Sequence, residues 1–278
     1  MKRLVVIRGG GELATAAAIY LHNSGFRVLM LEKAQPTSTR REVSFADAAY
    51  DGKKTVARVT CRREDSPREA EKRLKDGEVI MMIDPKGKHI PYFKSKVLLD
   101  GILAHENKGT LREWAEHTLA LGPGFCAGRD VDAVIETMRG HNLGKIIYEG
   151  YSYRDQGKLS LVDAAGAVGQ ILFAPEAGRL EGLHSISHKT QKDEPIANIH
   201  REDGSVLEIR SQLDGVLRGI IHSGCTVKKG QKIADVNPVM TREECFTLTD
   251  KARCVAGSVL QAVMAWESRK RKRITFDF

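Results

Sequence analysis

The sequence has few cysteines, few prolines and no long hydrophobic run. Its five cysteines form an odd number without a C-x-x-C pair, which argues against a disulfide scaffold or a cysteine zinc site and favours reduced thiols in the cytoplasm. Only eight prolines in 278 residues, with 41% hydrophobic and 29% charged residues, exclude a collagen-like or disordered chain. The longest stretch without Asp, Glu, Lys or Arg runs from Leu13 to Phe26 and is too short to cross a membrane. We therefore expect a globular cytoplasmic protein without a membrane segment.

The formal net charge of +8 first suggests a polyanionic partner, because 44 Lys and Arg outnumber 36 Asp and Glu. However, the uninterrupted basic run from Arg269 to Arg273 alone supplies five positive charges. Such a run is typical of a solvated helix end whose charge suits the helix dipole. The rest of the chain carries too small an excess to predict a nucleic-acid-binding face, so we expect no nucleic-acid partner.

The N-terminal residues have a strand, loop, helix, strand pattern. The apolar run from Leu4 to Ile7 leads into a glycine loop and then into an Ala-rich helical stretch that ends near His22. Phe26 to Leu31 is the second strand, and Glu32 follows it directly. This order predicts a mononucleotide-binding βαβ unit.

The glycine loop matches the G-x-G-x-x-A spacing of dinucleotide-binding turns. Small residues at these positions allow a tight turn, close approach of the backbone to a pyrophosphate, and close packing of the helix on the strand. The phosphate would lie at the helix N-terminus, and the terminal acid would accept hydrogen bonds from a ribose diol. NAD, a flavin dinucleotide and other nucleotide-capped cofactors all fit this pattern. The candidate cofactor-binding residues here are Gly9, Gly10, Gly11, Glu12, Ala14 and Glu32.

The α/β pattern continues to about residue 148, with continuously apolar strands that are typical of burial on both faces. We predict an α/β fold with a Rossmann-like, doubly wound parallel sheet. Asp84 and Asp100, at strand ends, would either gather at its ligand-binding edge or cap the following loops. Expected strands are Thr55 to Thr60, Val79 to Ile83, Val97 to Asp100 and Ile146 to Tyr148, and expected helices are Ser66 to Lys75, Leu111 to Thr118 and Val131 to Met138.

A second glycine loop, from Leu121 to Gly128, precedes a helix expected to begin near Asp130. Gly122 and Gly124 are therefore candidate backbone contacts for an anion. Cys126 in the same loop is either a reactive thiolate beside a helix N-terminus or a small buried hydrophobe.

Four basic or titratable side chains near these loops are candidate phosphate contacts, namely Arg40, Arg41, Arg139 and His141. The alternative is that the first two belong to an exposed charged turn, and that the others only complement a helix C-terminus. The pattern leaves both interpretations open.

The second half contains an internal repeat, in which Ala174 to Ile199 pairs with Ser211 to Val236 without a gap, at an offset of 37 residues. The two halves together resemble the barrel-sandwich hybrid of biotinyl and lipoyl carrier domains. The connecting stretch from His200 to Arg210 contains no lysine, so we expect a docking or lid module rather than a swinging arm. We expect no metal site at His184 and His188, because the i, i+4 spacing does not bring two imidazoles together on strands.

These patterns divide the chain into three parts. Residues 1–148 are the expected Rossmann-like cofactor-binding domain. Residues 149–240 are the repeated β domain, with halves 174–199 and 211–236, and residues 241–278 form a C-terminal helix with a basic tail. The patterns leave a homo-oligomer open.

Four motifs occur together in this chain: R-G-G-G-E-L-A from Arg8, R-R-x-V-S-F from Arg40, G-P-G-F-x-A-G from Gly122 with a following Asp130-Val131, and E-T-x-R-G-H-x-L-G from Glu136. As a set they resemble the YqeB-type accessory proteins of selenium-dependent molybdenum hydroxylases, and this resemblance covers nearly the whole chain. The N-terminal part is also similar to the Rossmann portion of XdhC-like xanthine dehydrogenase accessory proteins. The resemblance implies a protein that binds, protects and delivers the molybdenum cofactor to an apo-hydroxylase.

The resemblance further implies a molybdenum pterin that carries a cytidine diphosphate, whose pyrophosphate would occupy the first glycine loop. Our leading hypothesis is therefore a cofactor-handling maturation protein rather than a catalyst. Gly9, Gly11 and Ala14 would hold the pyrophosphate and Glu32 the ribose. The anionic groups of the pterin would contact Arg40, Arg139 and His141.

Two other classes of function stay open. One is an NAD(P)-dependent oxidoreductase that uses the same loop, with His141 or Cys126 near the chemistry. The chain has no G-x-S-x-G, H-E-x-x-H or Walker A motif, and no catalytic set stands out for it. The other is a pure interaction scaffold, in which the glycine loop binds no phosphate.

Overall fold

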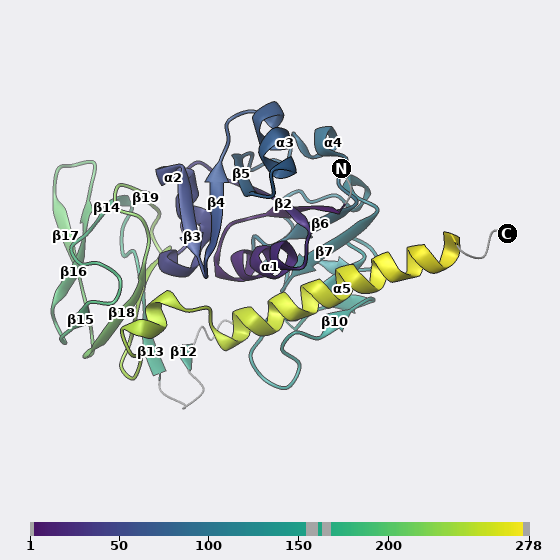
Figure 1. Cartoon of the computed structure of the whole chain (residues 1–278). Helices are drawn as coiled ribbons and strands as arrows, with labels where there is room; N and C mark the ends of the chain where they lie inside the picture. The colour runs from purple at the N-terminus through teal and green to yellow at the C-terminus, as the bar shows by residue number, and fades with distance from the viewer. Residues whose placement is uncertain (1–2, 154–160, 163–167, 275–278) are drawn as a thin grey trace.

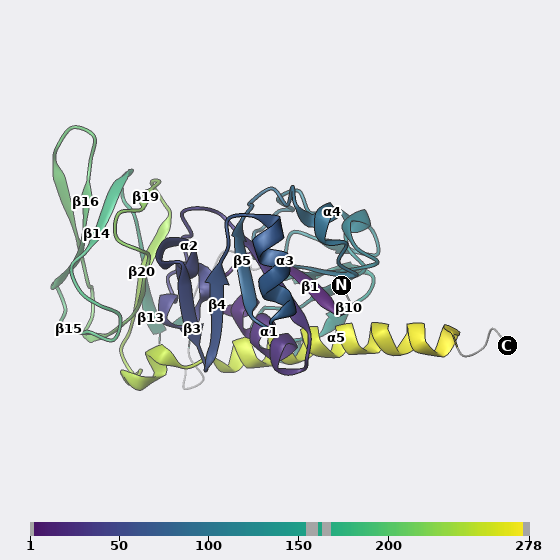
Figure 2. The same ribbon diagram turned by 45° about the horizontal axis from the view of Figure 1, so that its top comes forward.

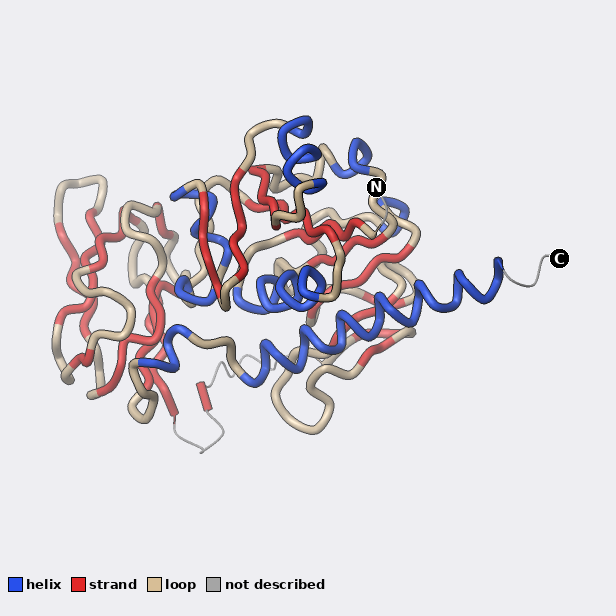
Figure 3. Tube along the Cα trace, in the orientation of Figure 1, coloured by secondary structure: helices blue, strands red, loops and turns tan. Residues whose placement is uncertain are grey.

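The chain forms a large mixed β-sheet with helices, a β-rich part made of antiparallel sheets, and a long C-terminal helix, as Figure 1 shows. The computed structural model describes residues 3–153, 161–162 and 168–274. The β-rich part lies at one end of the molecule, and helix α5 (Asp250–Ile274) runs from that end along α1 (Glu12–Asn23). Figure 2 shows the same arrangement from a second direction. The tube in Figure 3 shows mainly strands and loops in the β-rich part, and strands together with helices in the rest of the molecule.

The nine-stranded sheet has seven parallel strands and one antiparallel strand at each edge, in the order β10-β9-β7-β6-β1-β2-β5-β4-β3. The central strands are buried along nearly their whole length, because the sheet is covered on both faces. The strands are β1 (Leu4–Arg8), β2 (Arg27–Glu32), β3 (Lys53–Val56), β4 (Val59–Arg63), β5 (Val79–Ile83), β6 (Val97–Asp100), β7 (His117–Leu121), β9 (Ala133–Ile135) and β10 (Ile146–Ile147).

The N-terminal strand, glycine loop, helix and strand have the predicted order. The alanines of α1 are fully buried because this helix packs between the sheet and α5. Ala14 lies against the turn after β6, where a Cβ on Gly101 would come within 2.8 Å of the Ala14 Cβ. Small residues at both positions therefore let the helix approach the sheet closely.

Helix α5 covers α1 with an apolar face that includes Ala252, Val255 and Val259. The basic run Arg269 to Arg273 falls in its last turns, and the side chains of this run lie outside the described residues. None of the helices within the described ranges is long and apolar enough to cross a membrane.

The prediction of a Rossmann-like parallel sheet is wrong. A doubly wound sheet needs a helical crossover between successive parallel strands. Here β6 and β7 are joined through only a short 3-10 turn, η3 (Arg112–Trp114), and β7 and β9 through the two-residue strand β8 (Cys126–Ala127). Both sheet edges are antiparallel, and two further helices, α2 (Ala48–Asp51) and α4 (Ile90–Phe93), are single turns.

The helices predicted over Leu111 to Thr118 and Val131 to Met138 are also wrong. These segments contain the start of β7 and the whole of β9, and all three residues of β9 are buried. A short apolar run fits a buried strand as well as a helix, so periodicity alone could not separate the two.

Two other local predictions have different outcomes. The expected strand Thr55 to Thr60 is a hairpin of β3 and β4, in which Ala57 and Arg58 adopt positive φ angles of 46° and 67°. The helix predicted from Ser66 is confirmed as α3 (Pro67–Lys75), and the Ser66 side chain accepts a hydrogen bond from the Glu69 amide as its N-cap.

The predicted barrel-sandwich hybrid is corrected as well, because the β-rich part consists of two separate antiparallel sheets. One has the order β12-β13-β20-β18-β15 and the other β17-β16-β14-β19. Strands from outside the repeat extend both sheets. The domain boundaries near residues 148 and 240 stay predictions. The strands are β12 (Leu161–Val162), β13 (Val168–Phe173), β14 (Gly178–Gly182), β15 (Lys189–Thr190), β16 (Pro195–His200), β17 (Val206–Arg210), β18 (Gly215–Ile220), β19 (Thr226–Val227) and β20 (Lys232–Asn237), and a small separate pair joins β8 to β11 (Gly150–Tyr151).

The sequence repeat is visible in the structure. Strands β14, β15 and β16 begin 37 residues before β18, β19 and β20, the same offset as in the sequence. The long strands pair within each half, β14 with β16 and β18 with β20. The short strands are exchanged, because β15 pairs with β18 and β19 pairs with β14. The two halves are therefore interlocked around one apolar core.

Gly178 and Gly215 occupy equivalent places in the repeat, where one strand passes close to its neighbour. A Cβ on Gly215 would lie 2.6 Å from Asn237 O, and one on Gly178 would lie 2.5 Å from His200 O. We expect Gly215→Ala to lower the free energy of unfolding by about 1–3 kcal/mol, because the paired backbones must move apart. Urea denaturation measures this.

The matched control is Gly257→Ala in α5. An added Cβ there meets none of the described atoms within 4 Å, and alanine favours a helix interior, so this variant should keep or slightly raise stability. Equal stability of Gly215→Ala and wild type would contradict the close-approach explanation.

Candidate ligand-binding cavity

A cavity of about 1600 Å³ lies where the large sheet, the β-rich part and the start of α5 meet. The sheet contributes residues at the carboxyl ends of β1, β2 and β6, including the loop from Arg8 to Gly11. The β-rich part contributes Arg218 and Lys232, and the start of α5 contributes Asp250. Open α/β sheets bind ligands outside the carboxyl ends of their parallel strands, so this position suits a binding site.

The lining of this cavity carries more positive than negative groups. Nine of its residues are Lys or Arg and four are Asp or Glu. A concave site with an excess of one sign of charge concentrates ions of the opposite sign, so the cavity favours anionic ligands. The basic residues are Arg8, Lys33, Arg40, Lys108, Arg139, Arg218, Lys232, Lys251 and Arg253, and the acidic ones are Glu12, Glu32, Glu244 and Asp250.

The three glycines of the first loop have different roles. Gly9 has a φ of +92°, and a Cβ on it would lie 3.0 Å from Gly101 O. Gly10 packs against the backbone of Ala46, whereas a Cβ on Gly11 would meet no atom of the described residues within 4 Å. Among the described residues no side chain caps α1 at Gly11, so the amides of its first turn are suited to an anion. Gly11 is therefore the point at which a ligand can approach the helix.

Glu32 lies beside this loop and lines the cavity. Its Oε2 accepts a hydrogen bond from Gly10 N at 2.7 Å, and its Oε1 accepts one from Lys33 N at 2.8 Å. Burial raises the pKa of Glu32, and these two amide hydrogen bonds oppose the increase. Each carboxylate oxygen has a second lone pair that can accept a ligand hydroxyl.

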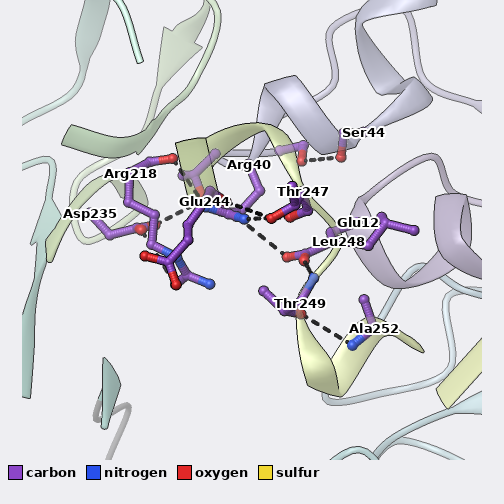
Figure 4. Close-up of polar contacts among 12 residues, drawn as sticks. Glu12, Arg40, Ser44, Arg218, Asp235, Glu244, Thr247, Leu248, Thr249 and Ala252 are labelled. Carbon is purple, nitrogen blue, oxygen red and sulfur yellow. Dashed lines mark hydrogen bonds and ion pairs between the residues drawn. The ribbon is translucent and has the colours of Figure 1, made fainter. Parts of the chain in front are cut away.

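Arg40 connects the start of α1 to the other two parts of the chain, as Figure 4 shows. Its Nε lies 3.5 Å from Glu12 Oε2, and its Nη1 and Nη2 donate to Arg218 O and Thr247 O at 3.4 and 3.5 Å. Burial lowers the pKa of Arg40, and the charge of Glu12 opposes this effect. Within the described part of the chain the buried Nε makes no hydrogen bond. This buried atom faces the Glu12 carboxylate, so Arg40 contributes positive charge to the cavity wall and not a free donor.

Beside Arg40, one completely buried carboxylate holds two cations of the cavity wall. Asp235 Oδ2 lies 2.8 Å from Lys232 Nζ, and Asp235 Oδ1 lies 3.6 Å from Arg218 Nη1. Thr39 Oγ1 also donates to Asp235 Oδ2 at 3.3 Å. The β-rich part therefore presents two fixed positive groups to the cavity, and one of them, Arg218, lies beside Arg40 (Figure 4).

The basic residues singled out from the sequence do not all reach the cavity. Arg40 and Arg139 line it, and Arg139 Nη1 lies 2.8 Å from Asp250 Oδ2. Arg41 does not line it and instead pairs with Asp47, with Nε 2.9 Å from Oδ2. His141 is exposed and lies outside the lining. Ligand contacts of these residues stay predictions.

Gly122 and Gly124 do not line the cavity, although Pro123 between them does. A Cβ on Gly122 would lie 2.6 Å from Thr137 Oγ1, and one on Gly124 would lie 2.7 Å from Ala104 O, so both glycines serve close packing. Strand β9 stands where a helix was expected near Asp130, so this loop does not lead into a helix N-terminus that could attract an anion. Half-buried Cys126 lies in β8 and not beside a helix start.

The acids at the strand ends cap loops and pair with neighbours. Asp84 accepts hydrogen bonds from the amides of Lys88 and His89 at 3.0 and 2.8 Å. Asp100 accepts one from the Ile102 amide at 3.0 Å, and its Oδ2 lies 3.4 Å from Arg8 Nη1. Both groups therefore stabilise the carboxyl edge of the sheet.

Sequence motifs missed the cations that the β-rich part supplies. Arg218 and Lys232 lie far from the glycine loop in sequence, so only the folded chain brings them together with Arg40. One signal was present in the repeat: the positions equivalent to these two cations hold Glu181 and Pro195.

The expectation that His184 and His188 lie apart is wrong. Their rings are stacked, with centroids 3.9 Å apart and planes within 2° of parallel. The segment between β14 and β15 is a turn and not a continuous strand, so strand geometry does not apply to this spacing.

No family model matches the chain. The chain is 38% identical over 262 residues to the uncharacterized protein YqeB of Escherichia coli strain K12. This match covers 94% of the chain and 47% of that protein, so the chain spans about half the length of its relative.

Solved structures give weaker likenesses. An aspartoacylase family protein from Mesorhizobium loti is 12% identical, with 87% of each chain covered and a TM-score of 0.28. The ectoine utilization protein EutE from Ruegeria pomeroyi is 11% identical over 84% of this chain and 57% of its own, with a TM-score of 0.26. At these TM-scores the likenesses do not establish a shared fold. The sequence similarity, which extends over nearly the whole chain, supports a relationship to YqeB-type proteins.

Proposed function

We propose that this chain is a cofactor-handling maturation protein for selenium-dependent molybdenum hydroxylases, and that its cavity binds a nucleotide-capped molybdenum pterin. The observation that supports this most is the position of the uncapped start of α1, which opens at Gly11 into a cavity with nine basic and four acidic lining residues. Helix N-termini and basic side chains are the two groups that most often hold phosphates in proteins.

The size of the cavity fits such a ligand. Sites for drug-sized molecules measure roughly 300–1,000 Å³, so about 1600 Å³ leaves room for a dinucleotide-sized cofactor. The positive charges of Arg40, Arg218 and Lys232 at the cavity wall suit several anionic groups at once.

Each part of the ligand would meet a different part of the chain. The pyrophosphate would accept hydrogen bonds from the first-turn amides of α1 next to Gly11, and a ribose hydroxyl would donate to Glu32. Anionic groups of the pterin would contact Arg40 and Arg218. The molybdenum would supply the redox chemistry in the recipient hydroxylase, whereas the residues here bind, orient and shield the ligand.

Calorimetric titration of the whole chain tests this proposal with three probes, namely cytidine diphosphate, inorganic pyrophosphate and NAD⁺. We expect cytidine diphosphate to bind more tightly than pyrophosphate, because the ribose adds a contact to Glu32. Binding should weaken as salt concentration rises, since the interaction is with charged groups. Tight binding of NAD⁺ without binding of cytidine diphosphate would instead support an NAD-dependent oxidoreductase.

A further inference from the structure

Three potential metal ligands lie close together in the β-rich part, outside the cavity described above. His184 and His188 come from the turn between β14 and β15, and Glu194 directly precedes β16. His188 Nε2 lies 2.8 Å and His184 Nε2 lies 3.1 Å from the same atom, Glu194 Oε1. One ligand atom from each residue lies within 4.8 Å of the others.

The carboxylate is held in place by its second oxygen. The amide of Gln191 donates to Glu194 Oε2 at 2.7 Å, which leaves Oε1 directed at the two imidazoles. Such outer contacts commonly orient the ligands of metal sites.

The backbone that carries these ligands is fixed by the fold. Ser187 and Asp193, which directly precede two of the ligands, have positive φ angles of 79° and 65°. The equivalent positions of the second repeat hold Gly224 and Gly230, with φ of 89° and 76°. Both repeats therefore have the left-handed backbone conformation at these positions. The fold fixes the backbone beside the ligands before any ion binds.

The fold does not need the three side chains themselves. At the positions equivalent to His184, His188 and Glu194, the second repeat holds Ile221, Cys225 and Gln231. Its strands nevertheless form at the same offsets as those of the first repeat. Two histidines and a glutamate in one half alone are therefore not explained by packing of the repeat.

We propose that His184, His188 and Glu194 bind a divalent transition metal of the Zn²⁺ class. Imidazole suits Zn²⁺, Cu²⁺ and Ni²⁺, whereas Mg²⁺ and Ca²⁺ prefer all-oxygen sites. With three protein ligands, the fourth position of a tetrahedral site is left to water or to an exogenous ligand.

All three side chains are partly exposed, with 25% to 34% of the side-chain surface accessible, so an ion can enter from solvent. Metal binding uses the Nε2 lone pairs, so it moves the ring protons to Nδ1 or releases them.

The test uses the whole chain without a histidine tag, and Zn²⁺ alone as the probe in equilibrium dialysis. We expect one Zn²⁺ per chain, and a loss of affinity of at least about tenfold in both His188→Gln and Glu194→Gln. Zn²⁺ should also raise the Tm of the wild-type protein more than that of either variant, because only the native site binds the ion tightly.

A matched control is His200→Gln, because His200 Nε2 lies 2.8 Å from Glu181 Oε2 in a histidine–glutamate pair of the same β-rich part. Its affinity for Zn²⁺ should equal that of the wild type. His184→Gln is a further variant should His188→Gln fail to fold. No binding of Zn²⁺ by the wild type, or equal binding by wild type and Glu194→Gln, would overturn the proposal and leave the cluster as an ion-pair network.

Discussion

Gly11→Asp is expected to weaken the binding of cytidine diphosphate by about 100-fold or more. Within the described ranges a Cβ at Gly11 meets nothing within 4 Å, and the φ of −67° and ψ of 175° of this residue suit any side chain, so the substitution leaves the fold intact. The new carboxylate would bind the first-turn amides of α1 as an N-cap and occupy the proposed phosphate position. Two like charges about 4 Å apart near a protein surface also repel by about 4 kcal/mol.

Two variants separate charge from shape. Gly11→Ala adds only a methyl group at the point of ligand approach and should weaken binding by about tenfold at most, corresponding to about 1.4 kcal/mol. Gly11→Asn has nearly the shape of aspartate without its charge and should fall between the two. Calorimetric titration gives the affinities, and thermal denaturation should show that none of the three variants loses stability. If Gly11→Asp bound the probe as tightly as Gly11→Ala, the phosphate would not lie at α1.

Arg8→Met is expected to lower the free energy of unfolding by about 3–5 kcal/mol. Arg8 and Asp100 are each only 1% exposed, and Arg8 also donates to Pro85 O at 2.8 Å and to Lys108 O at 3.3 Å. Thr110 Oγ1 completes this group by short hydrogen bonds to both charged side chains. Removal of the guanidinium leaves a buried carboxylate without its opposite charge.

The control is Arg62→Met, because Arg62 and Glu78 form a partly exposed pair, with Nε 3.0 Å from Oε2. We expect a loss of less than about 1 kcal/mol there, since solvent screens surface pairs. Urea denaturation measures both variants. Equal losses in the two would show that burial of Arg8 does not determine its contribution.

The loss in free energy of unfolding caused by Arg8→Met should depend on pH. Burial already raises the pKa of Asp100, and loss of Arg8 removes a charge that lowers it. A carboxyl group with a raised folded-state pKa gives stability that is present below its unfolded pKa, about 3.9, and is lost as pH rises through the folded pKa. The free energy of unfolding of the variant should therefore approach that of the wild type in acid, and the difference between the two should be largest at neutral pH.

Local patterns predicted the parts of the fold in which one short segment determines the result. The order of β1, the glycine loop, α1 and β2 follows from apolar periodicity and glycine spacing within a few residues. The N-cap at Ser66 is equally local. The offset of the internal repeat was readable because whole strands recur with their turns.

The remaining features depend on tertiary contacts that no local pattern contains. Strand β9 was mistaken for part of a helix because three buried residues cannot show a period, and its identity comes from pairing with β7 and β10. Arg218 reaches the cavity only because the β-rich part packs beside Arg40. The rings of His184 and His188 stack because both residues lie in the turn between β14 and β15, and sequence spacing alone does not show this turn.

Mass spectrometry of the ligand retained by the gently purified whole chain tests whether the cavity holds a nucleotide-capped molybdenum pterin. We expect a pterin that carries a cytidine diphosphate in the wild type and in Gly11→Ala, and its loss in Gly11→Asp. Recovery of only NAD or NADP, retained equally by all three proteins, would contradict it.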